Sequence, residues 1–505
     1  MRPRQLIGGG LALLAIALGA WQLERMRDGL VVERHRAGPI PVTLFRPATA
    51  ESSPIVVIAH GFAGSQQLMQ PFAITLARNG YLALTFDFPG HGGNPVPLQG
   101  GIAGDEVRSR ELLGTLDAVI ALGQAQPSAD GRVALLGHSM ASDIVVQAAQ
   151  RRADIAATIA VSLFTRDVTP DSPRNLLVID GALEPGLLIE EGYRVVGMAA
   201  EGAAQEGVTY GEFARGTARR LALADGVEHI GVLYSAESMV EARDWLDATF
   251  GRRGAGPLDV RGPWLGLLFG GLVLLAWPLS RLLPVVSLQP AGATLPWRRL
   301  LPVAVAPALL TPVLLWPLPT SFLPLLLGDY LAVHFAVYGL LTAGGLWLVG
   351  GLRATAWHPR RLIVAASLTA AYGVLVLGLP VDRYLSAFWP TWGRAPLILA
   401  MLGGTLPYFV TDEWLTRGVG LGSMRYVLTK ACFLLSLAVA IALSLERLFF
   451  LIIIVPAILL LFLVYGLLAT WAYGRPRQPL VGGLANALAF AWAIAVTFPV
   501  VGAPP

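Results

Sequence analysis

The chain has 505 residues, of which 55% are hydrophobic and only 14% are charged. Soluble globular proteins usually carry about a quarter of charged residues, so this composition excludes a wholly soluble enzyme and a disordered chain. Residues 264–505 hold 14 basic and five acidic residues, a net charge of +9, whereas residues 1–263 hold 23 and 28, a net charge of −5. Because the basic excess lies in the second part, nucleic acid is not an expected partner. The single cysteine, Cys432, excludes an intrachain disulfide and a cysteine-built metal site.

The first apolar run, Leu6–Leu23, follows the basic residues Arg2 and Arg4. It is long enough for one membrane-spanning helix. A cleaved signal peptide has the same basic start and apolar stretch. The run ends in the bulky segment Trp21–Arg25 and lacks the small residues of a cleavage site, which favours an uncleaved membrane anchor over residues 1–29.

Residues 30–250 resemble a soluble domain, in which short β-rich runs alternate with amphipathic stretches. This alternation is typical of βαβ units around a mostly parallel sheet. We therefore expect an α/β domain with helices on both faces of the sheet. The expected strands are Ile55–Ala59, Leu82–Phe86, Val133–Leu136, Ile155–Val161 and Leu176–Ile179, and the expected helices include Asp105–Leu122, Ile144–Arg151 and Glu237–Phe250.

A glycine-rich linker, residues 251–263, separates this domain from an all-α part over residues 264–505. Eight apolar runs in that part are candidate membrane-spanning helices, although two are short for a hydrocarbon core about 30 Å thick. The break at Glu446-Arg447 is alternatively a buried kink. The runs are Trp264–Leu283, Leu300–Leu318, Pro324–Val349, Leu362–Leu379, Ala395–Val410, Ala431–Leu445, Leu448–Trp471 and Leu480–Val501.

Basic residues in short loops indicate how such a chain is oriented in a membrane. With a cytoplasmic N-terminus in a bacterial-type inner membrane, the cytoplasmic loops hold more Lys and Arg than the opposite loops. That excess includes Arg417, Arg425 and Lys430. We therefore expect an integral membrane protein whose α/β domain lies outside the cytoplasm.

A serine stands where an apolar strand passes into a helix, in the segment Gly137-His138-Ser139-Met140-Ala141. This segment resembles the G-x-S-x-G nucleophile elbow of the α/β-hydrolase superfamily of esterase- and lipase-like serine hydrolases. Ala141 replaces the second glycine, which keeps a small residue at that place. A serine that only caps a helix is the alternative.

A second segment, His60-Gly61-Phe62, ends an earlier apolar strand and looks like the oxyanion loop of the same family. The resemblance implies that the backbone N–H groups of Phe62 and Met140 bind the oxyanion. It also implies that His60, Gly61, Gly137 and Ala141 shape the two motifs.

The segment Phe86–Gly93 is similar to the D-x-x-G-H-G turn that follows the family's fourth strand. We interpret its Asp87 and His91 as residues that shape the loop. His138, beside the serine, is given the same structural interpretation.

In this superfamily the triad follows the order serine, acid, histidine. The resemblance places the acid at Glu184, the fourth position of the turn that follows Asp180, and Asp180 itself is the rival. His229 is the only histidine between Glu184 and the apolar part. The implied catalytic triad is therefore Ser139, His229 and Glu184.

These residues predict a membrane-bound serine hydrolase that cleaves an ester, or an amide or thioester, through an acyl-enzyme. The expected partners are the lipid bilayer and a small-molecule, lipid or envelope ester, with no cofactor and no metal; the oligomeric state stays open. Two alternatives are an acyltransferase that uses the same triad, and a transporter or signalling protein with a hydrolase-like binding module.

The connection after Val161 is too short for a substantial helical lid, and the larger insert lies between Glu184 and Arg219. We expect a fairly open site that accepts a bulky substrate.

In the apolar part, Thr411–Gly418 resembles the E-E-x-x-x-R motif of the CAAX-processing and bacteriocin-processing intramembrane proteases. Those proteases hold a metal with histidines on later helices, and this chain has no histidine after His358. We therefore interpret Glu413 and Arg417 as an i, i+4 pair at a helix end.

Overall fold

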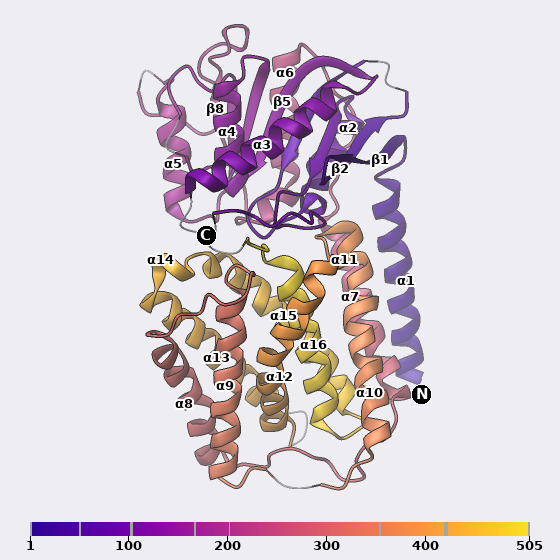
Figure 1. The fold of residues 1–505 in the computed structure, drawn as a ribbon. Coiled ribbons are helices and arrows are strands. Elements are labelled where there is room, and N and C mark those ends of the chain that lie inside the picture. Colours follow the sequence, from indigo (N-terminus) through magenta and orange to yellow (C-terminus); the bar gives the residue numbers. More distant parts are fainter. Residues whose placement is uncertain are drawn as a thin grey trace. The chain divides into compact units, whose positions relative to one another are not determined.

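The computed structural model describes residues 3–49, 52–100, 105–165, 168–200, 202–352, 355–418 and 423–502 (Figure 1). Arg2 lies outside these residues. The chain forms two compact units, which we describe separately. The sheet unit comprises residues 20–265, 381–391 and 499–505, and the helical unit comprises residues 1–19, 266–380 and 392–498.

The sheet unit is built on eight strands in the order β1-β2-β4-β3-β5-β6-β7-β8. Strand β2 pairs antiparallel with β1 and β4, and every other neighbouring pair is parallel. The predicted mostly parallel sheet is therefore confirmed. The strands are β1 (Leu30–Ala37), β2 (Ile40–Pro47), β3 (Ser53–Ala59), β4 (Leu82–Phe86), β5 (Ala129–His138), β6 (Ile155–Val161), β7 (Leu176–Gly181) and β8 (Arg219–Ala224).

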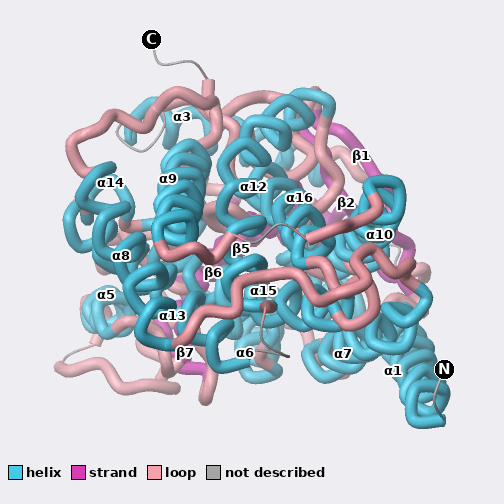
Figure 2. Tube along the Cα trace, turned by 90° about the horizontal axis from the view of Figure 1, so that it is seen from below, coloured by secondary structure: helices cyan, strands magenta, loops and turns pink. Residues whose placement is uncertain are grey.

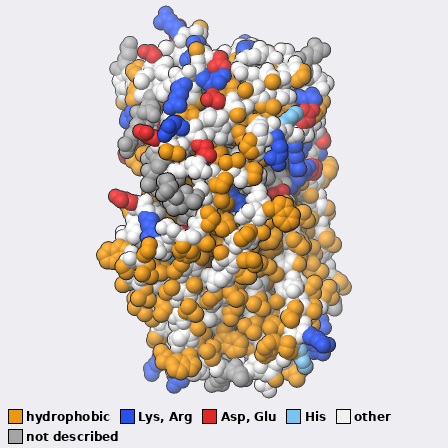
Figure 3. Space-filling model, viewed as in Figure 1, with side chains coloured by type: hydrophobic (Ala, Val, Ile, Leu, Met, Phe, Trp, Pro, Cys, Tyr) orange, Lys and Arg blue, Asp and Glu red, His pale blue; other side chains and the backbone are white. Residues whose placement is uncertain are grey.

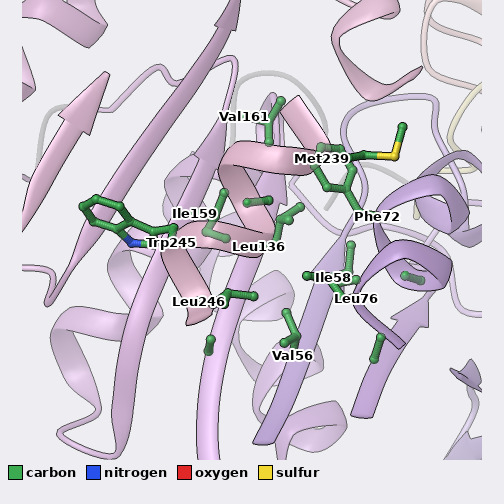
Figure 4. Packing of buried hydrophobic residues seen from close by; sticks show 14 of the residues in the cluster. Val56, Ile58, Phe72, Leu76, Leu136, Ile159, Val161, Met239, Trp245 and Leu246 are labelled. Carbon is green, nitrogen blue, oxygen red and sulfur yellow. The ribbon is translucent and has the colours of Figure 1, made fainter. Parts of the chain in front are cut away.

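Helices cover both faces of the sheet, because alternate residues of the central strands point to opposite sides. Val56 and Ile58 of β3 pack with α2 (Gln70–Arg78) and α6 (Ala236–Phe250), as Figure 4 shows. Val57, which lies between Val56 and Ile58 in the strand, packs instead with α3 (Asp105–Gln124) and α4 (Met140–Arg151) on the other face. Both sides of these strands are thus buried, which explains why they read as continuous apolar runs.

The connections at the carboxyl ends of the strands differ in length. Between β6 and β7, the described residues of 162–175 contain no helix, as expected for a site without a large lid. The longer connection from β7 to β8 contains α5 (Gly186–Gly197). Near the end of the chain, Val501 forms a parallel bridge with Leu98 and so belongs to the same unit.

The described residues contain nine helices that are long and apolar enough to cross a membrane. In Figure 2 the helices of the helical unit are seen nearly end-on, and in Figure 3 hydrophobic side chains dominate its visible surface. These features are those of an integral membrane protein. The helices are α1 (Pro3–Arg25), α7 (Gly262–Leu279), α8 (Trp297–Leu315), α9 (Gly328–Leu348), α10 (Pro359–Ala371) with α11 (Gly378–Tyr384), α12 (Ala395–Arg417), α13 (Ser423–Leu443), α15 (Phe450–Tyr473) and α16 (Pro479–Thr497), with the short α14 (Leu445–Leu448) between α13 and α15.

The charged residues near the end of α12 are buried in pairs. Arg417 Nε lies 2.7 Å from Glu413 Oε2, and Lys430 of α13 pairs with Asp412. The interpretation of Glu413 and Arg417 as an i, i+4 pair therefore agrees with the structure. Counting Arg417 and Lys430 as loop charges was wrong, because both lie within helices and are only 1% and 5% exposed. Each forms a buried ion pair with a carboxylate.

Candidate active site

Ser139 occupies a strained turn between β5 and α4. Its φ of 55° lies in the left-handed region, which a residue with a side chain seldom adopts. The turn is so tight that a Cβ on Gly137 would lie 2.3 Å from the carbonyl oxygen of Ala141, so only glycine fits at position 137. Ala141 itself is fully buried, and its methyl group is accommodated where the family pattern has glycine.

The structure brings Ser139, His229 and Glu184 together in one hydrogen-bonded chain. His229 Nε2 lies 3.0 Å from Ser139 Oγ, and His229 Nδ1 lies 3.0 Å from Glu184 Oε2. The three residues follow the carboxyl ends of β5, β8 and β7, which lie in the same half of the sheet. With a proton on Nδ1, Nε2 is free to accept the proton of the serine hydroxyl.

The second oxygen of the Glu184 carboxylate is also held. Ser162 Oγ donates to Glu184 Oε1 at 2.7 Å, and the backbone N–H of Gly181 donates to the same atom at 3.0 Å. Ser162 follows β6 directly, with a φ of 56°. Sequence reasoning missed Ser162, whose only signal is its position at the end of a strand beside the elbow.

Asp180, the rival acid, is fully buried near the end of β7, and its carboxylate is hydrogen-bonded to backbone and not to His229. Its Oδ1 accepts the backbone N–H of Leu163 at 3.3 Å, and its Oδ2 has no hydrogen-bond partner among the described residues. Burial, and then the nearby charge of Glu184, raise the pKa of Asp180 to about 8. The geometry therefore favours Glu184 as the partner of His229.

The loop after β3 lies against the serine turn. A Cβ on Gly61 would lie 3.0 Å from both Ser139 Cβ and His138 Nδ1, so glycine permits this approach. Phe62 follows Gly61 directly, and Met140 is the first residue of α4, whose N–H has no acceptor within the helix. The arrangement fits the oxyanion donors that the resemblance implied.

Two histidines beside the site form hydrogen bonds with backbone groups of neighbouring loops. The backbone N–H of Phe88 donates to His60 Nε2 at 3.1 Å, so the proton is on Nδ1, which donates to the Gly61 carbonyl at 2.8 Å. His138 Nε2 lies 3.0 Å from the carbonyl oxygen of His229 and donates to it. Burial lowers the pKa of both His60 and His138, which keeps them neutral.

The Asp87 turn has the contacts of a loop-shaping element. Asp87 accepts the backbone N–H of Gln66 at 2.8 Å and that of Gly93 at 3.0 Å. His91 Nδ1 lies 2.8 Å from the carbonyl oxygen of Pro89. His91 therefore holds its own turn, and Asp87 joins that turn to the segment that follows the loop after β3.

Residues 50–183 match a family model described as "Serine aminopeptidase, S33". This match includes the serine turn and ends one residue before Glu184. An uncharacterized protein of Mycobacterium tuberculosis, found in two strains, is 31% identical over 123 residues, which are 24% of this chain and 40% of the relative. The chain therefore matches less than half the length of these relatives.

Among solved structures, a predicted CIB-like hydrolase of Thermoplasma acidophilum is 15% identical, with a TM-score of 0.33, over 44% of this chain and 99% of that chain. E-2-(acetamidomethylene)succinate hydrolase is 12% identical, with a TM-score of 0.32, over 43% and 100%.

The buried Asp180 predicts how stability depends on pH. Because its pKa is raised from 3.8 to about 8, its protonated form stabilises the fold fully below pH 4, and this contribution is lost as pH rises towards 8. The Asp180→Asn protein should therefore lose less thermal stability than the wild type between about pH 4 and pH 8. Thermal unfolding of both proteins across this range measures the effect, and parallel curves would contradict it.

Proposed function

The chain contains an α/β-hydrolase domain, and we propose that it is a membrane-bound serine hydrolase that cleaves an ester through an acyl-enzyme. The observation that carries the proposal is the hydrogen-bonded chain of Ser139, His229 and Glu184, with both hydrogen bonds at 3.0 Å. His229 lies 90 residues after Ser139 and 45 residues after Glu184, and the fold places its imidazole between the serine hydroxyl and the carboxylate.

The geometry supports a two-step reaction. Ser139 Oγ attacks the ester carbonyl carbon while His229 Nε2 takes the hydroxyl proton, and Glu184 stabilises the imidazolium that forms. The backbone N–H groups of Phe62 and Met140 stabilise the oxyanion, and the imidazolium then gives its proton to the departing alcohol. Water then attacks the carbonyl carbon of the acyl-enzyme while His229 takes a proton from the water. His229 gives this proton to Ser139 Oγ as the bond to the acyl group breaks, which releases the acid and restores the serine.

Apolar side chains around the triad support an ester with a large apolar group as the substrate. Phe164, Leu183, Leu187 and Ile230 follow the carboxyl ends of β6, β7 and β8, and they are 51%, 66%, 61% and 36% exposed. We name these four residues the apolar rim. Exposed apolar side chains at the end of the sheet that carries the triad are available to bind an apolar group, so the rim is suited to the acyl chain of a lipid ester.

The membrane helices and the loop charges support a location in a bacterial-type inner membrane, with the hydrolase domain outside the cytoplasm. Arg298 and Arg299, and also Arg475 and Arg477, are among the basic residues on the cytoplasmic side in this orientation.

Replacing the nucleophile tests the proposed function. The Ser139→Ala protein should hydrolyse p-nitrophenyl esters at least about 10³-fold more slowly than the wild type, since the attacking oxygen is lost. Ser128→Ala, a serine in the turn before β5, serves as the matched control and should keep wild-type activity. Equal activity of wild type and Ser139→Ala would refute a serine hydrolase and revive the binding-module alternative.

The apolar rim predicts a preference for long acyl chains. The kcat/KM of the wild type for p-nitrophenyl octanoate should exceed that for the acetate by about tenfold or more, because each buried CH₂ contributes roughly 0.8 kcal/mol. In the Phe164→Ser/Leu187→Ser protein this ratio should fall towards one, with acetate hydrolysis preserved. Val32→Ser, an exposed apolar position on the edge strand β1, is the control. A ratio that the rim variant leaves unchanged would contradict this use of the rim.

A further inference from the structure

Residues 381–391 are part of the sheet unit, although the chain before and after them belongs to the helical unit. This segment comprises the last four residues of α11 and the connection that follows, and α11 and α12 both lie in candidate membrane spans. A connection between membrane helices has thus become a component of the hydrolase domain. We name residues 381–391 the clamp.

The clamp contacts the loop that carries the implied oxyanion donor. The backbone N–H of Ala387 donates to Ser65 Oγ at 2.9 Å, and Ser386 Oγ lies 3.3 Å from the same oxygen. Ser65 is 1% exposed and stands three residues after Phe62. Among the described residues, both hydrogen-bond partners of the Ser65 hydroxyl therefore come from the clamp.

The loop after β3 needs such support. Ala63 has a φ of 55°, a left-handed conformation that costs a residue with a side chain about 1–3 kcal/mol and persists only when its surroundings enforce it. Gly61 and Gly64 stand on either side, and glycine restrains the backbone little. Within the loop, the backbone N–H of Gly64 donates to the carbonyl oxygen of Gly61 at 3.1 Å.

A buried polar network fixes the clamp to the start of α2, which follows this loop. Arg261 donates to the carbonyl oxygen of Tyr384 at 3.2 Å and to Gln70 Oε1 at 3.3 Å, and it pairs with Asp259. Arg27 donates to the same Gln70 oxygen at 3.0 Å. Arg261 and Asp259 are 2% and 0% exposed, so the pair is shielded from water. A charge-assisted hydrogen bond is stronger in such a buried environment than in water.

The other end of the network lies in the last turn of α1. Arg383 donates to both carboxylate oxygens of Glu24, at 2.8 and 3.0 Å, and the hydroxyl of Tyr384 donates to the same carboxylate at 2.5 Å. A two-pronged arginine–carboxylate contact fixes orientation as well as distance. The clamp is therefore held at one end by Glu24 and Arg261 and contacts the oxyanion loop through Ser65.

We propose that the clamp positions the oxyanion loop for catalysis, with Ser65 as the positioning residue whose hydroxyl is hydrogen-bonded to the clamp. The inference rests on the proposed function. A displacement of about 1 Å in a catalytic group can cost about 10²-fold in rate, and loss of one oxyanion donor costs about 10²–10³-fold. A connection between two candidate membrane helices, which belongs to the sheet unit, thereby supplies a supporting component of the active site.

Kinetics of the full-length protein test this role. Ser65→Ala should lower kcat for p-nitrophenyl esters about tenfold or more with little change in KM, because substrate binding does not use the oxyanion donors. Inhibition by a trifluoromethyl ketone, which forms a tetrahedral oxyanion on the serine, should weaken in proportion to the loss of kcat/KM. Ser65→Thr keeps a hydroxyl and should restore most of the rate, an outcome that a merely structural defect would not give.

Two further variants make the result decisive. Ser386→Ala removes the partly exposed hydroxyl on the clamp side of the contact and should lower kcat by a smaller factor, about threefold. This variant tests the proposal if Ser65→Ala does not fold. Ser238→Ala replaces a buried serine on α6 and should behave as the wild type. Wild-type kcat and inhibitor affinity in folded Ser65→Ala and in Ser386→Ala would overturn the clamp. A wild-type protein that hydrolyses no ester would instead overturn the proposed function.

Discussion

The proposed chemistry depends on the hydrogen bond between His229 Nδ1 and the carboxylate of Glu184. This bond places the imidazole proton on Nδ1, so that Nε2 faces Ser139 as an acceptor. Glu184 cannot turn away, because Ser162 and Gly181 donate to its other oxygen. The sheet makes the arrangement possible, since β5, β7 and β8 deliver the three triad residues from carboxyl ends on the same side.

The parts of the site that are local in sequence could be predicted, and those that depend on distant contacts could not. Ser139 was recognisable because a tight strand-to-helix turn demands small residues at fixed spacing, and His229 because no other histidine stands between Glu184 and the apolar part. The resemblance favoured Glu184 over Asp180, but only the folded chain shows that the Glu184 carboxylate lies within hydrogen-bond distance of His229. Ser162 was missed because its partner lies 22 residues away along the chain.

The fold class followed from the sequence, and the edges of the sheet did not. The central strands are buried on both faces and therefore appear as apolar runs, whereas the half-exposed β1 alternates and carries charged residues. Strand β8 begins with Arg219 and Arg220, which hide its strand pattern. The clamp was beyond prediction altogether, because a short connection between two apolar runs gives no sign that it belongs to another unit.

The high hydrophobic content is an average over an acidic hydrolase domain and an apolar helical part, and the clamp suggests why the two share one chain. One helix would be enough to anchor a hydrolase. Here Ser65 and Gln70, at the two ends of the segment between the oxyanion loop and α2, receive hydrogen bonds from residues adjoining membrane helices. Loss of those residues would remove the support for a strained loop.

The central claim is that Ser139 is a nucleophile activated by His229. Mass spectrometry of peptides from the fluorophosphonate-treated protein tests it most directly, because the reagent reacts covalently with an activated serine. The account predicts a phosphonyl adduct on the peptide containing Ser139 in the wild type, and its near-complete loss in His229→Ala. An adduct on another serine, or equal modification of Ser139 without His229, would contradict it.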